Sequence, residues 1–159
     1  MALYAITKEP YAYRQLEKSE VPSALSLALE VFSEFEAPVY PEEGTAEFLS
    51  CLGDEKYLSG IEYYGAFDGE TLVGIIGFRQ KVRHICFFFV KGSYHRRGIG
   101  TKLFLHLLGD TPHGEVTVNS SPFGLPFYKS LGFAAAGREQ TVNGIRFTPM
   151  KYTETEEKI

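Results

Sequence analysis

The sequence predicts one α/β domain of the α+β kind, covering residues 1–159, with helices packed on a mixed β-sheet. The length is that of one domain, and 44% hydrophobic with 23% charged residues is an ordinary balance for a soluble one. Segments with apolar residues three and four positions apart alternate with strand-like apolar runs. Turn signals separate these segments at short intervals, and the chain shows no linker, repeat or low-complexity tract.

The N-terminal part predicts a strand followed by two helices. Residues 11–16 have the pattern of a strand. A helix that begins near Glu20 carries an apolar stripe as far as Phe32 and ends before Pro38. A second helix is expected over 42–52, after a proline-containing loop.

The rest of the chain predicts most of the sheet. Asp68-Gly69 is a strong signal for a hairpin between two strands, and the apolar segment 84–90 predicts a central strand buried on both faces. Asn143-Gly144 is a possible second turn, and Gly132 is suited to end a helix. The expected elements are strands over 61–67, 72–78, 84–90 and 114–119, helices over 98–108 and 122–131, final strands near 133–137 and 141–152, and a frayed tail over 153–159.

Composition excludes several classes of function. A formal net charge of −4 gives no general attraction to nucleic acid. No apolar run approaches the about 18 residues of a membrane span, and the first ten residues lack the pattern of a signal peptide. Cys51 and Cys86 lie 35 positions apart without a CxxC pair, which argues against a disulfide framework or a zinc site. We therefore expect a cytoplasmic protein with no metal, membrane or nucleic-acid partner.

Charge is divided along the chain into an acidic and a basic block. Residues 19–55 contain nine carboxylates and no Lys or Arg, whereas residues 71–109 contain seven basic residues and no Asp or Glu. Either block alone is compatible with a solvated face. Together they favour a site with one end for a polyanion and the other end for a cation.

A glycine turn between the 84–90 strand and the following helix carries the clearest chemical signal. Gly98 and Gly100 have no Cβ, so a ligand can approach the backbone, and the free N–H groups of a first helical turn favour an anion. Arg96 and Arg97 add positive charge. Walker A and Rossmann loops are both excluded, because no Lys-Ser/Thr follows and Leu103 replaces the third Rossmann glycine. The segment predicts a phosphate cradle, and a ligand-free tight turn is the alternative.

Two segments resemble the GCN5-related N-acetyltransferase (GNAT) family, in its small bacterial type. Residues 95–100, His-Arg-Arg-Gly-Ile-Gly, resemble the pyrophosphate-binding signature Q/R-x-x-G-x-G/A, with His95 in the Q/R position. Asn119, Phe127-Tyr128 and Gly132-Phe133 resemble the family's N…FY…GF block. The resemblance covers roughly 61–152. It implies a mostly antiparallel central sheet with splayed central strands and flanking helices, and acetyl-CoA as co-substrate without a metal.

The same resemblance implies roles for individual residues. Tyr128 would be the general acid that protonates the departing thiolate, since a phenol of pKa about 10 is protonated at neutral pH. The N–H of Phe88 would face the thioester carbonyl, Val90 would pair with pantetheine, and Asn119 would lie beside it. The amides of 97–101 would hold the pyrophosphate. The complete cofactor-binding set is Phe88, Val90, His95, Arg96, Arg97, Gly98, Ile99, Gly100, Thr101 and Asn119.

The base has more than one candidate. His84 lies six residues before Val90, where the family often places a carboxylate, and an imidazole can accept a proton at neutral pH. Regular strand alternation would put His84, Cys86, Phe88 and Val90 on one face. The other candidates are Glu34, Glu36, Glu42 and Glu43.

The acidic block predicts the acceptor end of the site. The loop between the two N-terminal helices occupies the segment that forms one wall of the acceptor cleft in the resembled family. The expected acceptor-binding residues are Glu34, Glu36, Tyr40, Glu42 and Glu43. We therefore expect acetyl transfer from acetyl-CoA to a cationic small-molecule or peptide amine by direct attack. A non-catalytic acyl-CoA-binding or sensing domain is the alternative, and a homodimer is left open.

Overall fold

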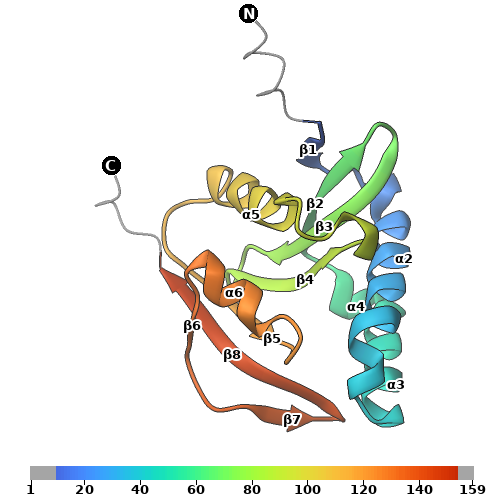
Figure 1. Ribbon diagram of the computed structural model, residues 1–159, viewed down its shortest axis with the longest axis vertical. Helices are drawn as coiled ribbons and strands as arrows, with labels where there is room; N and C mark the ends of the chain where they lie inside the picture. Colours follow the sequence, from blue (N-terminus) through green and yellow to red (C-terminus); the bar gives the residue numbers. More distant parts are fainter. Residues whose placement is uncertain (1–9, 154–159) are drawn as a thin grey trace, which may run out of the picture.

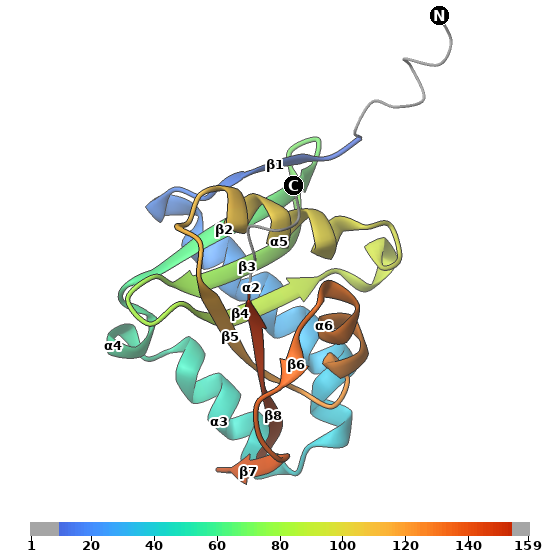
Figure 2. The same cartoon turned by 90° about the vertical axis from the view of Figure 1, so that its left-hand side faces the viewer.

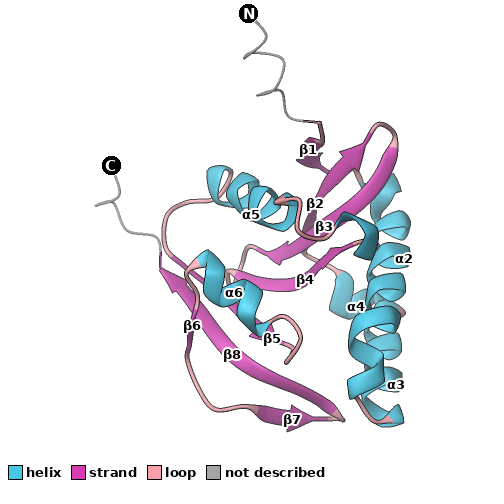
Figure 3. Ribbon diagram, in the orientation of Figure 1, coloured by secondary structure: helices cyan, strands magenta, loops and turns pink. Residues whose placement is uncertain are grey.

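The computed structural model of the chain describes residues 10–153 and confirms the expected fold class (Figures 1 and 3). An open sheet of eight strands is mostly antiparallel, in the order β1-β2-β3-β4-β5-β8-β6, with β7 paired to β8. The strands are β1 (Ala12–Gln15), β2 (Ile61–Asp68), β3 (Thr71–Arg79), β4 (His84–Val90), β5 (Glu115–Ser120), β6 (Ala134–Ala135), β7 (Gln140–Val142) and β8 (Ile145–Thr153).

Helices cover both faces of this sheet. The α-helices are α2 (Val21–Val31), α3 (Glu42–Leu52), α4 (Glu55–Leu58), α5 (Ile99–Gly109) and α6 (Leu125–Leu131). Short 3₁₀ turns lie at Lys18–Glu20, Ala37–Val39 and Gly92–Tyr94, and a π-helical turn, η2 (Phe32–Glu36), extends α2. Figures 1 and 2 show α5 and α6 on one side of the sheet and α2 to α4 on the other. No helix among residues 10–153 is both long enough and apolar enough to cross a membrane.

Two hydrophobic cores form, one on each face. Phe78, Leu103 and Phe104 belong to the core under α5, and Phe32 and Ile75 belong to the core under α2. All five side chains are buried. Burial of this much apolar surface on both faces fixes the path of the central strands, and therefore the geometry of the space between them.

The central strands β4 and β5 diverge, as the resemblance implies. Their parallel pairing is limited to His84 with Thr117 and Ile85 with Val118. Beyond Ile85, β4 continues to Val90 while its backbone edge on the β5 side is left without a strand partner. This divergence opens a wedge in the sheet.

A β-bulge interrupts β4 just before the wedge. Gly77 of β3 pairs with Phe87, but the next residue, Phe78, pairs with Ile85, so Cys86 is an extra residue in the strand. The bulge reverses the side-chain alternation, because Ile85 packs into the α5 core and Phe87 into the α2 core. As expected, β4 packs against a core on each face, although alternate residues of the strand are only partly buried.

The C-terminal strands differ slightly from the expectation. The strand expected over 141–152 is two strands, β7 and β8, joined at Asn143-Gly144, whose φ angles of 51° and 83° suit a tight hairpin. Gly144 contacts the start of α3 backbone to backbone, because a Cβ on Gly44 would lie 2.5 Å from the Gly144 carbonyl oxygen. Of the tail expected to fray, Thr153 ends β8 and the remainder lies outside the described residues.

Candidate active site

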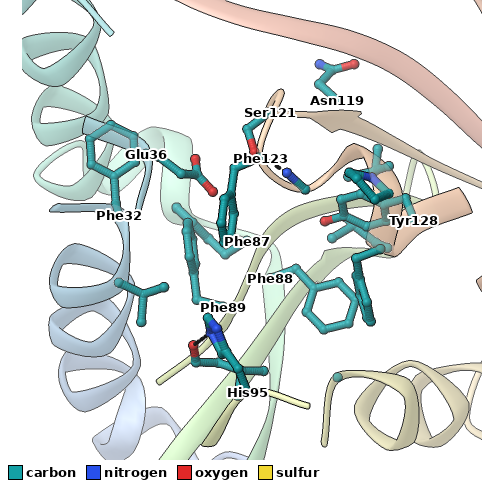
Figure 4. Close-up of a pocket in the computed structure, with 18 of the residues that line it drawn as sticks. Phe32, Glu36, Phe87, Phe88, Phe89, His95, Asn119, Ser121, Phe123 and Tyr128 are labelled. Atoms are coloured by element: carbon teal, nitrogen blue, oxygen red, sulfur yellow. Dashed lines mark hydrogen bonds between the residues drawn. The ribbon is translucent and has the colours of Figure 1, made fainter. Parts of the chain in front are cut away.

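The wedge between β4 and β5 opens into a cavity of about 700 Å³. Its walls come from α2 and η2, from β4, from the turn before α5, from the segment between β5 and α6, and from β8. Figure 4 shows the side chains that point into it. The cavity therefore joins the middle of the acidic block, at Glu36, to the basic glycine turn at Gly98, about 60 residues later in the sequence.

The glycine turn has the backbone geometry of an anion cradle. Gly98 precedes the first turn of α5 with φ of 81°, a left-handed conformation that favours glycine, and Arg96 has φ of 64°. No side chain caps the N–H groups of this first turn. The N–H groups therefore remain available to an anionic ligand, which the helix dipole also favours. Gly98, Gly100 and Thr101 all line the cavity.

Gly100 has a packing role that sequence reasoning missed. A Cβ at this position would lie 2.8 Å from Cζ of Phe127, closer than real Cβ contacts. The residue type at position 100 is therefore set at least partly by the approach of α6 to α5. At Gly98, in contrast, a Cβ would meet nothing within 4 Å, and the positive φ is the constraint.

His95 connects the cradle to the end of β4. One ring nitrogen, Nε2, lies 2.7 Å from the carbonyl oxygen of Val90 and donates to it, and the ring packs on Phe35 with centroids 4.8 Å apart. Arg97 points away from the cradle, because it donates to the Tyr11 hydroxyl and lies over the ring of Tyr94. His95 and Arg96 line the cavity, and Arg97 does not.

Tyr128 of α6 lies on the opposite wall from η2. Its ring packs against Phe88, Phe127 and Phe133, and only 7% of the residue is exposed. Figure 4 shows its hydroxyl directed into the cavity. Burial raises the pKa of this phenol well above its usual range, and the negative charge of Glu36 raises it further. Tyr128 is therefore a neutral hydroxyl that holds its proton at neutral pH.

Glu36 is the carboxylate that the fold brings into the cavity. It is the last residue of the π-helical turn η2, and such turns are frequent at functional sites. Burial raises the pKa of Glu36 to about 7, and hydrogen bonding with Ser121 opposes this rise. A carboxyl group with this pKa exchanges protons easily at neutral pH.

The structure places His84 outside the cavity. Its Nδ1 lies 2.7 Å from the Thr117 hydroxyl oxygen, at the closed end of the wedge. The β4 bulge at Cys86 means that His84 does not share a face with Phe88 and Val90, so the regular alternation expected from the sequence is wrong here. Burial, and then the charge of Arg79, lower the pKa of His84.

Of the other expected acceptor residues, only Tyr40 lines the cavity, where its hydroxyl donates to the carbonyl of Arg146 over 3.1 Å. Glu34, Glu42 and Glu43 are exposed and lie outside the cavity lining. Of the residues expected to bind the cofactor, Phe88, Val90, Ile99 and Asn119 also line the cavity.

Several lining residues were not expected from the sequence. Ser121 lies two residues after Asn119 in the second motif, so that motif could have indicated Ser121. Four aromatic side chains of the lining come from four different segments, and no spacing in the sequence signals that they meet. This unexpected aromatic set is Phe32, Phe48, Phe123 and Phe147. Among residues 10–153, no group of three or more His, Cys, Asp or Glu side chains is placed to hold a metal ion.

An open mixed sheet, a splayed central pair and a glycine turn at the wedge together define a protein of the GNAT fold. The chain belongs to the GNAT acetyltransferase family, because the family model described as acetyltransferase (GNAT) domain matches residues 36–154, about three quarters of the sequence. A search of curated proteins finds no match.

Solved structures agree on the fold. A GCN5-related N-acetyltransferase from Rhodopseudomonas palustris superposes with a TM-score of 0.77 at 22% identity, over 92% of this chain and 97% of that one. The PaiA N-acetyltransferase of Thermoplasma acidophilum, in complex with coenzyme A, superposes with a TM-score of 0.69 at 21% identity, over 92% of this chain and 100% of that one. The ribosomal-protein-S18-alanine N-acetyltransferase of Escherichia coli superposes with a TM-score of 0.61 at 16% identity, over 94% of this chain and 98% of that one.

Proposed function

We propose that this protein transfers an acetyl group from acetyl-CoA to a primary amine by direct attack, with Tyr128 as the general acid. The observation that carries the proposal is the meeting, in one cavity, of an uncapped glycine turn, an unpaired β4 edge and the Tyr128 hydroxyl. A GNAT neighbour crystallised with coenzyme A supports the same donor here.

The donor is expected to lie along the wedge. Its pyrophosphate would meet the N–H groups at the start of α5, and the pantetheine arm would pair with the free edge of β4 near Val90. The thioester would then reach the middle of the cavity, with its carbonyl near the N–H of Phe88. Each contact uses backbone groups that the fold leaves without a strand partner, and near Val90 the group left open is the N–H, because the Val90 carbonyl already accepts from His95.

The leaving group needs a proton. When the tetrahedral intermediate collapses, the C–S bond breaks and the thiolate of coenzyme A takes a proton from the Tyr128 hydroxyl. Burial keeps the Tyr128 phenol protonated at neutral pH, so it has a proton to give when the thiolate forms beside it. The nitrogen of the new amide then returns a proton to Tyr128.

Tyr128→Phe tests this assignment, because it removes only the hydroxyl. We expect coenzyme A affinity by calorimetry to stay near wild type and kcat to fall about 10²–10⁴-fold. Tyr40→Phe is the matched control, since it removes a second tyrosine hydroxyl of the cavity, one that is bonded to a carbonyl. A fall in kcat that is equal in both variants would contradict the role of Tyr128. Coenzyme A binding without turnover of any amine would favour a non-catalytic acyl-CoA-binding domain.

A further inference from the structure

The acceptor side of the cavity combines one carboxylate with an aromatic lining. Among the described residues that line the cavity, Glu36 is the only acid. Around it the fold gathers side chains from α2, α3, β4 and β8. The apolar members of this acceptor side are Val31, Phe32, Phe48, Phe87, Phe89 and Phe147. Such a surface binds an apolar body together with a single positive charge.

Glu36 forms no ion pair with any Lys, Arg or His within residues 10–153. Arg146, a basic residue of the cavity lining, is paired with Glu139 at 3.3 Å. Figure 4 shows the Glu36 carboxylate and the Tyr128 hydroxyl directed into the cavity from opposite sides. A group bound between them would contact a proton acceptor on one side and a proton donor on the other.

We propose that Glu36 receives the ammonium group of the acceptor and takes its proton, and that the acceptor is a monoamine with an apolar, aromatic or aliphatic body. The proposal rests on the proposed acetyl transfer. An ammonium group gives one proton to the Glu36 carboxylate, and the freed nitrogen lone pair forms the C–N bond to the thioester carbon. After the C–S bond breaks and Tyr128 has been reprotonated, Glu36 releases its proton to solvent. The net products are the acetamide, free coenzyme A and one proton.

This acceptor differs from the polycation that the acidic block suggests. Three of the four glutamates expected near the acceptor, Glu34, Glu42 and Glu43, lie outside the cavity lining. A second ammonium inside the cavity would lose its hydration without a second carboxylate to pair with, and burial of an unpaired charge is strongly unfavourable. A diamine is therefore a poorer acceptor than a monoamine of the same length.

The groups that face Glu36 define what a pH profile reports. They are Ser121 from the segment after β5, Tyr128 of α6, Tyr40 and, on β8, Arg146. Burial raises the pKa of both tyrosines, so they stay neutral below about pH 9. His95 lines the same cavity, so the profile of His95→Gln is measured beside that of Glu36→Gln to separate their contributions.

The first experiment measures kcat/KM for butylamine, phenethylamine and putrescine at saturating acetyl-CoA, from about pH 6 to about pH 10. In the wild type, kcat/KM for the monoamines should rise with pH only to about 7, the pKa of Glu36, and then level off. Glu36→Gln can use only amine that is already neutral, about one molecule in a thousand near pH 7.4 for a pKa near 10.4. Its activity should fall about 10²–10³-fold at neutral pH and recover towards wild type near pH 10.

Two further variants sharpen the result. Glu34→Gln removes an exposed carboxylate from the same π-helical turn and should leave the profile unchanged. Ser121→Ala removes the hydrogen bond that opposes the raised pKa of Glu36, so the inflection in the pH profile should move to higher pH.

The two amines of equal length test the acceptor class. The kcat/KM of the wild type for butylamine should be at least tenfold higher than that for putrescine.

The outcomes are distinct. An unchanged pH profile in Glu36→Gln, with amines still acetylated, overturns the role of Glu36 and leaves acetyl transfer intact. A preference for putrescine overturns the acceptor class. If the wild type binds coenzyme A but acetylates none of these amines or a wider amine panel, the proposed function fails, and the assignment of Glu36 fails with it.

Discussion

The buried carboxylate of Glu36 should make the folded protein less stable as pH rises. Burial raises its pKa from 4.5 to about 7, so between these two values the native state binds more protons than the unfolded state. Stability that depends on such a group is fully present below the unfolded pKa and decreases as pH rises towards the folded pKa. This pH dependence has the opposite sign to that of a carboxylate held in a salt bridge, whose contribution to stability increases as pH rises.

The magnitude follows from the same two values. The interval from 4.5 to about 7, at about 1.4 kcal/mol for each pH unit, corresponds to about 3 kcal/mol. Glu36→Gln keeps the shape of the side chain and removes the charge. The substitution should therefore stabilise the protein by up to about 3 kcal/mol more at pH 8 than at pH 5, or roughly 6–12 °C in Tm for a chain of this size.

Thermal unfolding followed by circular dichroism at about pH 5 and about pH 8 measures this difference. The quantity to compare is the Tm of Glu36→Gln minus that of the wild type at each pH, which cancels the titration of all other groups. Glu34→Gln, an exposed neighbour on the same turn, is the control and should show no such difference. If Glu36→Gln changes Tm equally at both pH values, the carboxylate carries no burial penalty and the reasoning is refuted.

Three other predictions follow from the site. Thr101→Glu adds a carboxylate at an exposed position in the first turn of α5. Calorimetry should then show that coenzyme A binds at least tenfold more weakly, a loss of about 1.4 kcal/mol. The same carboxylate should stabilise the helix by about 0.3–1 kcal/mol through the helix dipole. Thr101→Gln is its neutral control, and equal weakening in both would exclude a charge effect. Gly100→Ala brings a methyl group to 2.8 Å from Phe127 and should lower stability by about 1–3 kcal/mol in denaturant titration, partly recovered by Phe127→Leu. An unchanged midpoint would show that the contact relaxes freely. His84→Gln should keep the pH profile of kcat/KM, since the ring lies outside the cavity; loss of an inflection would restore its role as base.

The glycine turn before α5 was predictable because local residue types determine it. Gly98 needs a left-handed backbone and the turn precedes an apolar helix, and both facts are visible in the sequence. Strand and helix boundaries were predictable for the same reason, since hairpin signals such as Asp68-Gly69 and Asn143-Gly144 specify their own geometry.

Which of the expected acidic residues would line the cavity was not predictable, because backbone irregularities determine it. The π-helical turn brings Glu36 into the cavity and leaves Glu34 exposed, and no residue in the turn signals an extra backbone position. The bulge at Cys86 changes the face of His84, although the segment 84–90 contains neither glycine nor proline. Both irregularities depend on packing between distant segments, which spacing along one chain does not report.

The contact between Gly44 and Gly144 bears on how the acceptor specificity of this fold can change. Backbone meets backbone there, with no room for a side chain, so the position of the start of α3 is tied to the β7–β8 hairpin beside Tyr40, which lines the cavity. Neither glycine lines the cavity itself. If the proposed function holds, insertion or shortening at 143–144 should therefore change which amines are accepted without altering any residue of the lining.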